Sequence, residues 1–120
     1  MADYIEIHDL LLRTIVGVNP EEQQTCQDVI LKIRMQADLR AAGQSDDIDQ
    51  TVNYRTICKQ IIQHVEPGRF QLVERIAEDV AAICLQNPRV LRVWVSVEKP
   101  GALRFARSVG VQIERGRDAQ

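Results

Sequence analysis

Apolar and polar residues alternate near both ends of the chain, whereas its middle repeats apolar residues at helical spacing. Alternation places every second side chain on one face, which is typical of a strand that is buried on one side. It predicts four strands: Tyr4–Val18, Asp28–Leu39, Val90–Val97 and Phe105–Glu114. The alternation breaks near Asp9, so we expect an irregularity within the first strand.

Two amphipathic helices are predicted between the second and third strands. The first follows a capping residue, Thr51 or Asn53, and ends at Pro67-Gly68, which cannot continue a helix. The second begins at Phe70 and ends before Asn87-Pro88. Both carry apolar residues three and four positions apart, so each helix has one apolar stripe that can pack on a sheet.

This order of elements, ββααββ, indicates an α+β fold with a four-stranded antiparallel sheet and two helices on one face. The 120 residues are expected to form a single domain, 1–120. The polar stretch Ala41–Gln50 should be a surface loop, and Gly116–Gln120 a frayed tail. An open sheet has two edges. The outer strands contain few residues of the kind that keep an edge strand from pairing with another chain. We therefore expect copies of the chain to associate through their strands.

Composition narrows the possible functions. Hydrophobic residues make up 45% of the chain and charged residues 27%, which is ordinary for a soluble globular protein. The net charge is -2 without a basic stripe, which argues against nucleic-acid binding. No apolar run approaches the roughly 20 residues of a membrane span, and the first residues do not resemble a secretory signal. The three cysteines lack disulfide or zinc spacing, so we expect free thiols and a cytoplasmic location.

The candidate chemical centre is Lys99, which directly follows an apolar strand and precedes Pro100-Gly101. Proline and glycine interrupt a strand, so the chain should turn there and leave the lysine at one end of the sheet. A lysine in a turn is most often a solvated charge. A lysine at the mouth of a pocket, partly withdrawn from water, could instead act as a general acid or base.

Two carboxylates and a phenol are the other candidates, and each has an ordinary structural explanation. Glu22 lies in the loop after the first strand and could be a surface carboxylate. Glu74 lies near a helix start, where the helix dipole favours an acid, but it could also bind an N-C-N group through both oxygens. Tyr54 could be a half-buried core residue or a proton relay. The residues alone indicate a small α+β oligomer that could be an acid/base enzyme.

Several segments together resemble the dihydroneopterin aldolase and dihydroneopterin triphosphate epimerase family of folate biosynthesis. The resemblance spans about residues 4–115, and the order and spacing of its segments are highly specific. These segments are Arg13–Val18 with Glu22, Ser45–Ile48, Asn53-Tyr54, Phe70–Glu74, Glu98–Ala102 and Val109–Arg115.

The resemblance implies the tunnelling fold, in which four subunits close a barrel of sheets around a tunnel. Two such rings commonly stack, so the expected assembly is a homotetramer or a homo-octamer. The implied substrate is a pterin bound between neighbouring subunits, with no cofactor. Glu74 would hold its amino-pyrimidine edge. Backbone groups at three positions would assist: Val52, Leu72 and Val73.

For catalysis, the resemblance implies that Lys99 and Tyr54, the tyrosine from the adjacent subunit, exchange protons with the trihydroxypropyl side chain. Glu22 would close the pocket over that side chain. Retro-aldol cleavage would give 6-hydroxymethyl-7,8-dihydropterin and glycolaldehyde. The C=N group of the dihydropterin accepts the electrons, so neither a metal nor a lysine Schiff base is required. Epimerisation at C2′ is the expected side reaction.

Within the family, the segments indicate two activities. Lys99–Ala102 and Val109–Arg115 resemble the aldolase, whereas Leu12–Thr14, Asp47–Gln50 and Asn53–Glu66 resemble the triphosphate epimerase. Because the segment that carries the chemistry resembles the aldolase, we predict an aldolase, with the epimerase as the alternative. A ring that binds a pterin or purine without turnover is a remote alternative, since the full set of catalytic candidates is present. A triphosphate would need basic residues at the pocket rim, for which the candidates are Arg13, Arg55, Lys59, Arg104 and Arg107.

Overall fold

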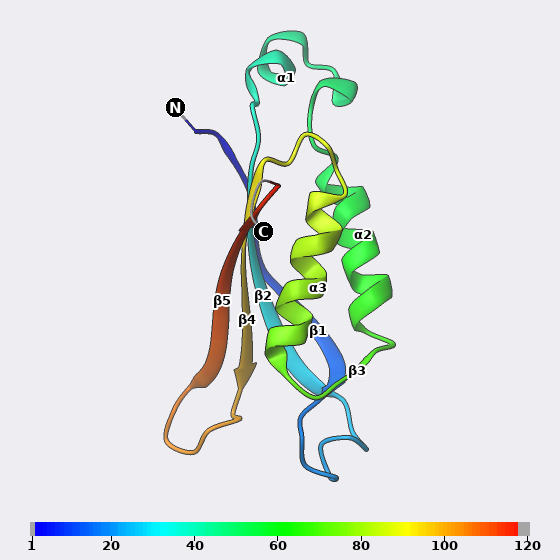
Figure 1. The fold of residues 1–120 in the computed structure, drawn as a ribbon, viewed down its shortest axis with the longest axis vertical. Coiled ribbons are helices and arrows are strands. Elements are labelled where there is room, and N and C mark those ends of the chain that lie inside the picture. The colour runs from blue at the N-terminus through cyan, green and yellow to red at the C-terminus, as the bar shows by residue number, and fades with distance from the viewer. Residues whose placement is uncertain (1, 118–120) are drawn as a thin grey trace.

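Five strands form one curved sheet in the computed structural model, which describes residues 2–117 (Figure 1). The strands are β1 (Tyr4–Val16), β2 (Gln27–Gln36), β3 (Arg69–Phe70), β4 (Arg92–Pro100) and β5 (Ser108–Gly116). They lie in the order β3-β1-β2-β4-β5. The four long strands pair antiparallel, as the alternation predicted, and β3 pairs parallel with β1.

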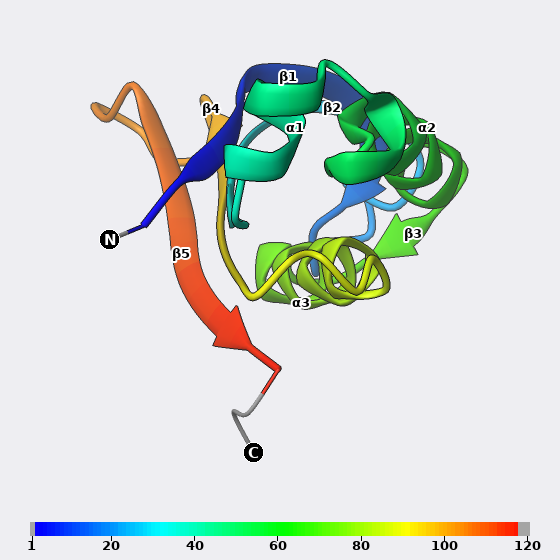
Figure 2. The ribbon, with the colours of Figure 1, turned by 90° about the horizontal axis from the view of Figure 1, so that it is seen from above.

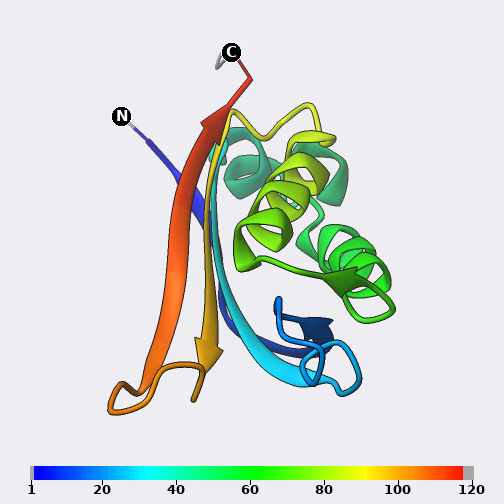
Figure 3. The ribbon, with the colours of Figure 1, turned by 60° about the horizontal axis from the view of Figure 1, so that its bottom comes forward.

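The helices all lie on the concave side of the sheet, which curls around them (Figures 2 and 3). The two predicted helices are α2 (Tyr54–Val65) and α3 (Val73–Leu85). Asn53 caps α2 by accepting two backbone hydrogen bonds from its first turn. The stretch expected to be a loop instead contains α1 (Arg40–Ser45) and the 3₁₀ turn η1 (Ile48–Gln50). All residues of α1 and η1 are at least partly exposed. They therefore lack the buried apolar stripe from which a helix can be predicted.

The short strand β3 corrects the predicted four-stranded sheet. Arg69 and Phe70 pair with the end of β1, so the second long helix begins at Val73 and not at Phe70. A two-residue strand is too short to show alternation. Its pairing depends on where the connection between α2 and α3 passes the sheet, which is decided by packing.

The register between β1 and β2 shifts once, between Ile7 and Leu10. Asp9 lies in this shift and adopts a left-handed backbone conformation with φ 53°. This confirms the irregularity predicted near Asp9, and it is a bulge of the kind that bends a strand locally.

β4 and β5 extend beyond their predicted ends. β4 runs to Pro100, which pairs with Ser108, so Lys99 lies within the strand and not in the turn. Proline fits at this position because the pairing of β4 with β2 ends at Glu98, so Pro100 lies beyond that ladder and need not donate to β2. β5 includes Gly116, which was assigned to the tail, and residues 118–120 of that predicted tail lie outside the described part of the chain.

The core lies between the sheet and the helices. Alternate residues of β2 and β4 are fully buried, and α2 and α3 bury their predicted stripes against them. This buried set includes Leu31, Met35, Val93, Ile61 and Ile76. Within residues 2–117, no helix is long and apolar enough to cross a membrane.

Candidate functional site

Lys99 is the last member of the apolar face of β4. Val93, Val95 and Val97 are completely buried on that face, and alternation places Lys99 next in the series. Its side chain is only 11% exposed. Lysine is rarely buried to this extent without a partner, because an unpaired ammonium group is costly to remove from water.

The partner of Lys99 is Glu22. Lys99 Nζ donates a hydrogen bond of 2.6 Å to Glu22 Oε2, although the two residues are 77 positions apart. Glu22 lies in the segment that joins β1 to β2, and this segment and the end of β4 lie at the same end of the molecule (Figure 1). The fold thus brings two of the candidate catalytic residues into direct contact.

Gly17 makes room for the Glu22 carboxyl group. It has a φ of 145°, and a Cβ atom at this position would lie only 2.2 Å from Glu22 Cδ. The carboxyl group therefore packs directly over the glycine. The sequence pattern marks Gly17 as the end of an alternating run and gives no sign of this contact.

Two further donors orient the Glu22 carboxylate. The Asn19 backbone N–H donates to Oε1 over 3.2 Å, and the Gln27 side-chain amide donates to Oε2 over 3.4 Å. The hydrogen bond from Lys99 is the main cause that lowers the pKa of Glu22 below its ordinary value, and those from Asn19 and Gln27 add to it. Glu22 is therefore ionised at neutral pH. Gln27 was not among the predicted site residues, because nothing in the strand pattern distinguishes it.

The start of α3 lies at the same end of the molecule as Lys99 (Figure 1). Leu72 is the N-cap residue and is half-exposed, Val73 is partly exposed, and the Glu74 carboxylate is exposed in the first turn. The first turn of a helix has backbone N–H groups without helical partners. Together with the carboxylate, these groups could bind a flat heterocycle that presents both donors and acceptors.

Tyr54 and Val52 lie at the opposite end of the helical layer. Tyr54 opens α2 and is 57% exposed, while Val52 is buried just before it. The 12 residues of α2 span about 18 Å, and the helix runs from η1 towards β3 (Figure 1). A single chain therefore does not bring Tyr54 to Lys99.

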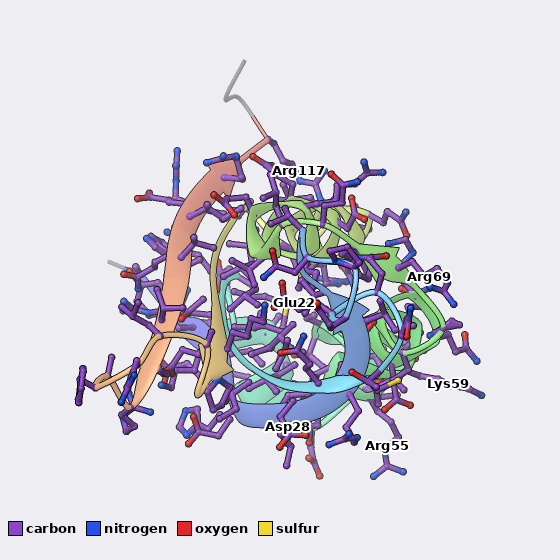
Figure 4. All side chains as sticks on the ribbon, turned by 90° about the horizontal axis from the view of Figure 1, so that it is seen from below. Glu22, Asp28, Arg55, Lys59, Arg69 and Arg117 are labelled. Atoms are coloured by element: carbon purple, nitrogen blue, oxygen red, sulfur yellow. The ribbon has the colours of Figure 1, made fainter. Side chains whose placement is uncertain are left out.

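Of the basic residues considered for a triphosphate, two project away from Glu22 and two others are paired with carboxylates. Figure 4 shows Glu22 near the centre of the view from below, whereas Arg55 and Lys59 project outward from α2. Arg13 forms an ion pair of 2.6 Å with Asp28 of β2, and Arg107 forms one of 3.1 Å with Glu98 of β4.

The opposite face of the sheet carries a separate polar cluster around Glu98. Lys32 donates to Glu98 Oε1 over 2.6 Å, while Ser108 and Arg107 donate to Oε2 over 2.8 Å and 3.1 Å. These contacts, led by the one from Lys32, lower the pKa of Glu98 to about 2. A hollow of about 570 Å³ on this face includes Lys32 and Trp94 but not Lys99. Among residues 2–117, no three His, Cys, Asp or Glu side chains are grouped as metal ligands would be.

Comparison with known families identifies the family of the chain. A family model described as FolB, dihydroneopterin aldolase, matches residues 5–114. The chain belongs to this FolB family. It is a pterin enzyme of folate biosynthesis, from a family that contains aldolases and triphosphate epimerases.

FolB-family relatives with both activities are similar to this chain. The dihydroneopterin triphosphate 2′-epimerase of Pseudomonas aeruginosa is 41% identical over 109 residues, which cover 91% of this chain and 89% of the relative. The dihydroneopterin aldolase of Escherichia coli is 40% identical over 114 residues, which cover 95% of this chain and 93% of the relative. The crystal structure of Escherichia coli dihydroneopterin aldolase in complex with neopterin superposes with a TM-score of 0.91 at 40% identity, over 95% of this chain and 99% of that one.

Proposed function

We propose that this FolB-family enzyme is a dihydroneopterin aldolase, which cleaves 7,8-dihydroneopterin into 6-hydroxymethyl-7,8-dihydropterin and glycolaldehyde. The observation that carries the proposal is the contact between Lys99 and Glu22 at the end of β4. An ammonium group held by a carboxylate, and largely withdrawn from water, is suited to moving protons on a bound substrate. The similarity to an aldolase whose structure contains neopterin supports a pterin as the ligand.

The reaction breaks the C1′–C2′ bond of the trihydroxypropyl side chain. A base removes the proton of the C2′ hydroxyl group, and the electron pair of the breaking bond moves into the C=N group of the dihydropterin. Protonation of C1′ then gives the hydroxymethyl product. Lys99, acting through a water molecule, and Tyr54 exchange these protons, while Glu22 holds the lysine and closes the pocket. If the bond re-forms on the other face of the bound aldehyde, C2′ is inverted, so epimerisation accompanies cleavage. Because the substrate supplies its own electron sink, the reaction needs neither a metal nor a cofactor.

The pterin ring binds at the start of α3 in this proposal. The Glu74 carboxylate accepts two hydrogen bonds from the amino-pyrimidine edge, in the way that carboxylates bind guanidinium groups. Backbone groups of Leu72 and Val73 complete the contact. The exposure of Glu74 and the position of α3 at the Lys99 end of the molecule support this arrangement.

We further propose that neighbouring copies complete the site in a homotetramer, or in a homo-octamer of two stacked tetramers. Tyr54 and Val52 lie a whole helix length from Lys99 within one chain, so an adjacent subunit must supply them. β5 forms one edge of the sheet and can pair with another chain. One domain over residues 1–120 and a cytoplasmic location belong to the same proposal. The family match over residues 5–114 supports the first, and the three free cysteines support the second.

A second candidate function is the 2′-epimerisation of dihydroneopterin triphosphate. It is favoured by the 41% identity to the Pseudomonas aeruginosa epimerase. The deciding experiment offers 7,8-dihydroneopterin and its triphosphate to the purified enzyme in parallel and separates the products by chromatography. Glycolaldehyde and 6-hydroxymethyl-7,8-dihydropterin from the unphosphorylated compound are the expected products. If the only product were the C2′ epimer of the triphosphate, the aldolase assignment would be wrong.

Two substitutions test the roles of the residues. Lys99→Ala should abolish turnover but leave neopterin binding measurable, because Lys99 handles protons and does not hold the ring. Glu74→Ala should destroy binding. The matched control for Glu74→Ala is Glu66→Ala, which alters an exposed carboxylate just after α2 and should change neither property. Near-normal turnover by Lys99→Ala would contradict the proposed mechanism.

A further inference from the structure

Gln23 follows Glu22 in the chain and uses both hydrogens of its side-chain amide. Its Nε2 atom donates to the carbonyl oxygen of Gly17 over 2.6 Å and to that of Phe70 over 2.9 Å. The backbone N–H of Gly17 donates to the same Phe70 oxygen over 3.0 Å. The Arg69 guanidinium donates to the backbone carbonyl of Gln23 over 2.7 Å. The segment after β1 is thus fastened to β3 from both sides.

These hydrogen bonds join the two segments that carry the proposed site. On one side, Gln23 is the next residue in the chain after Glu22, whose carboxylate accepts the hydrogen bond from Lys99. On the other side, Phe70 precedes Leu72, the N-cap residue of α3, by only two positions. A displacement at Gln23 therefore alters the position of the ion pair relative to the start of α3.

The backbone pairing between these segments is short. β1 and β3 share only two register pairs, Ile15 with Arg69 and Val16 with Phe70. Such a short ladder does little by itself to fix the position of one segment relative to the other, because its few hydrogen bonds must offset the conformational entropy that both segments lose. The Gln23 side chain adds hydrogen bonds just beyond the last register pair, where the chain leaves the sheet.

We propose that Gln23 is a positioning residue that holds the Glu22–Lys99 pair at a fixed distance from the start of α3. The inference rests on the proposed function, since this distance matters if one substrate spans both places, with its ring at Glu74 and its side chain at Lys99. Gln23 acts through Glu22 and does not itself handle protons. Nothing in its sequence context, a polar loop, distinguishes it from its neighbours.

The test compares Gln23→Met with Gln24→Met. Methionine has nearly the length of glutamine but no hydrogen-bond donor, and Gln24 is an exposed neighbour in the same loop. We expect Gln23→Met to lower kcat/KM for 7,8-dihydroneopterin about 10- to 100-fold, since a misplacement of about 1 Å can cost this much. It should also weaken neopterin binding. The Glu22 pKa, followed by the carbon-13 NMR signal of its carboxyl group, should rise towards its ordinary value. Gln24→Met should match the parent enzyme in all three measurements.

Two results would overturn the proposal. One is a Gln23→Met enzyme with parental kcat/KM and an unchanged Glu22 titration. The other is an equal loss in Gln24→Met. If Gln23→Met fails to fold, Gln23→Asn replaces it, since asparagine keeps the amide but is one methylene too short to reach both carbonyl groups. If the parent enzyme converts neither pterin, the proposed function fails, but neopterin binding and the Glu22 titration still decide the role of Gln23.

Discussion

Replacing Gly17 by alanine tests whether the Glu22 carboxylate depends on the space above this glycine. The added Cβ atom would lie 2.2 Å from Glu22 Cδ, 2.3 Å from Oε1 and 2.6 Å from Cβ. Ordinary contacts between such atoms are about 3.5–4.0 Å. The Glu22 side chain therefore has to move by more than about 1 Å, and this breaks its hydrogen bond of 2.6 Å with Lys99.

The same substitution also strains the backbone. Gly17 has a φ of 145°, which residues with a Cβ atom rarely adopt. Holding alanine in such a conformation costs about 1–3 kcal/mol of folding free energy. In a domain of this size, that corresponds to a fall in melting temperature of roughly 4–15 °C. The displaced carboxylate should reduce kcat/KM by about 100-fold, the effect expected for a misplacement of about 1 Å in an active site.

Gly43→Ala is the matched control. Gly43 lies in α1, and a Cβ atom there would meet nothing within 4 Å. Alanine is the better helix former by about 1 kcal/mol, so this variant should be equally or slightly more stable and fully active. The assays are thermal unfolding by circular dichroism and turnover of 7,8-dihydroneopterin. Parental turnover by Gly17→Ala, or equal effects of the two substitutions, would refute the role assigned to Gly17.

Two further predictions concern acid stability and the assembly. The Glu98 pKa of about 2 lies below the ordinary 4.5, so its contribution to stability is present above pH 4.5 and should be lost as the pH falls towards 2. Urea unfolding at several pH values should show this loss in the parent. Glu98→Gln should be less stable at neutral pH, and its free energy of unfolding should change less with acid. An identical pH dependence of stability in the two proteins would contradict the role assigned to Glu98. For the assembly, Lys99→Ala and Tyr54→Phe should each be nearly inactive, but refolding them together in equal amounts should restore about a quarter of the sites, because the two residues come from different subunits. Recovery of no activity would place both residues in one chain or Tyr54 outside the site.

The long elements of the fold could be predicted from the sequence because each has a period of its own. Alternation identified the four long strands, including the break at Asp9, and the stripes of α2 and α3 identified the two helices. Each pattern shows, from neighbouring residues alone, which side of the helix or strand faces the core. Lys99 was predicted in the turn after Val97, and it was the structure that placed it next after Val97 on the buried face of β4.

Contacts between distant segments were decided by the tertiary structure alone. The parallel pairing of β3, the packing of Glu22 over Gly17 and the hydrogen bonds of Gln23 and Gln27 join short irregular segments that have no period. Their physical cause is the close approach of the segment after β1 to the segment before α3, which depends on how the helices pack on the sheet. The sequence by itself therefore determined the elements and the candidate residues, whereas packing decided that, within one chain, Glu22 meets Lys99 and Tyr54 does not.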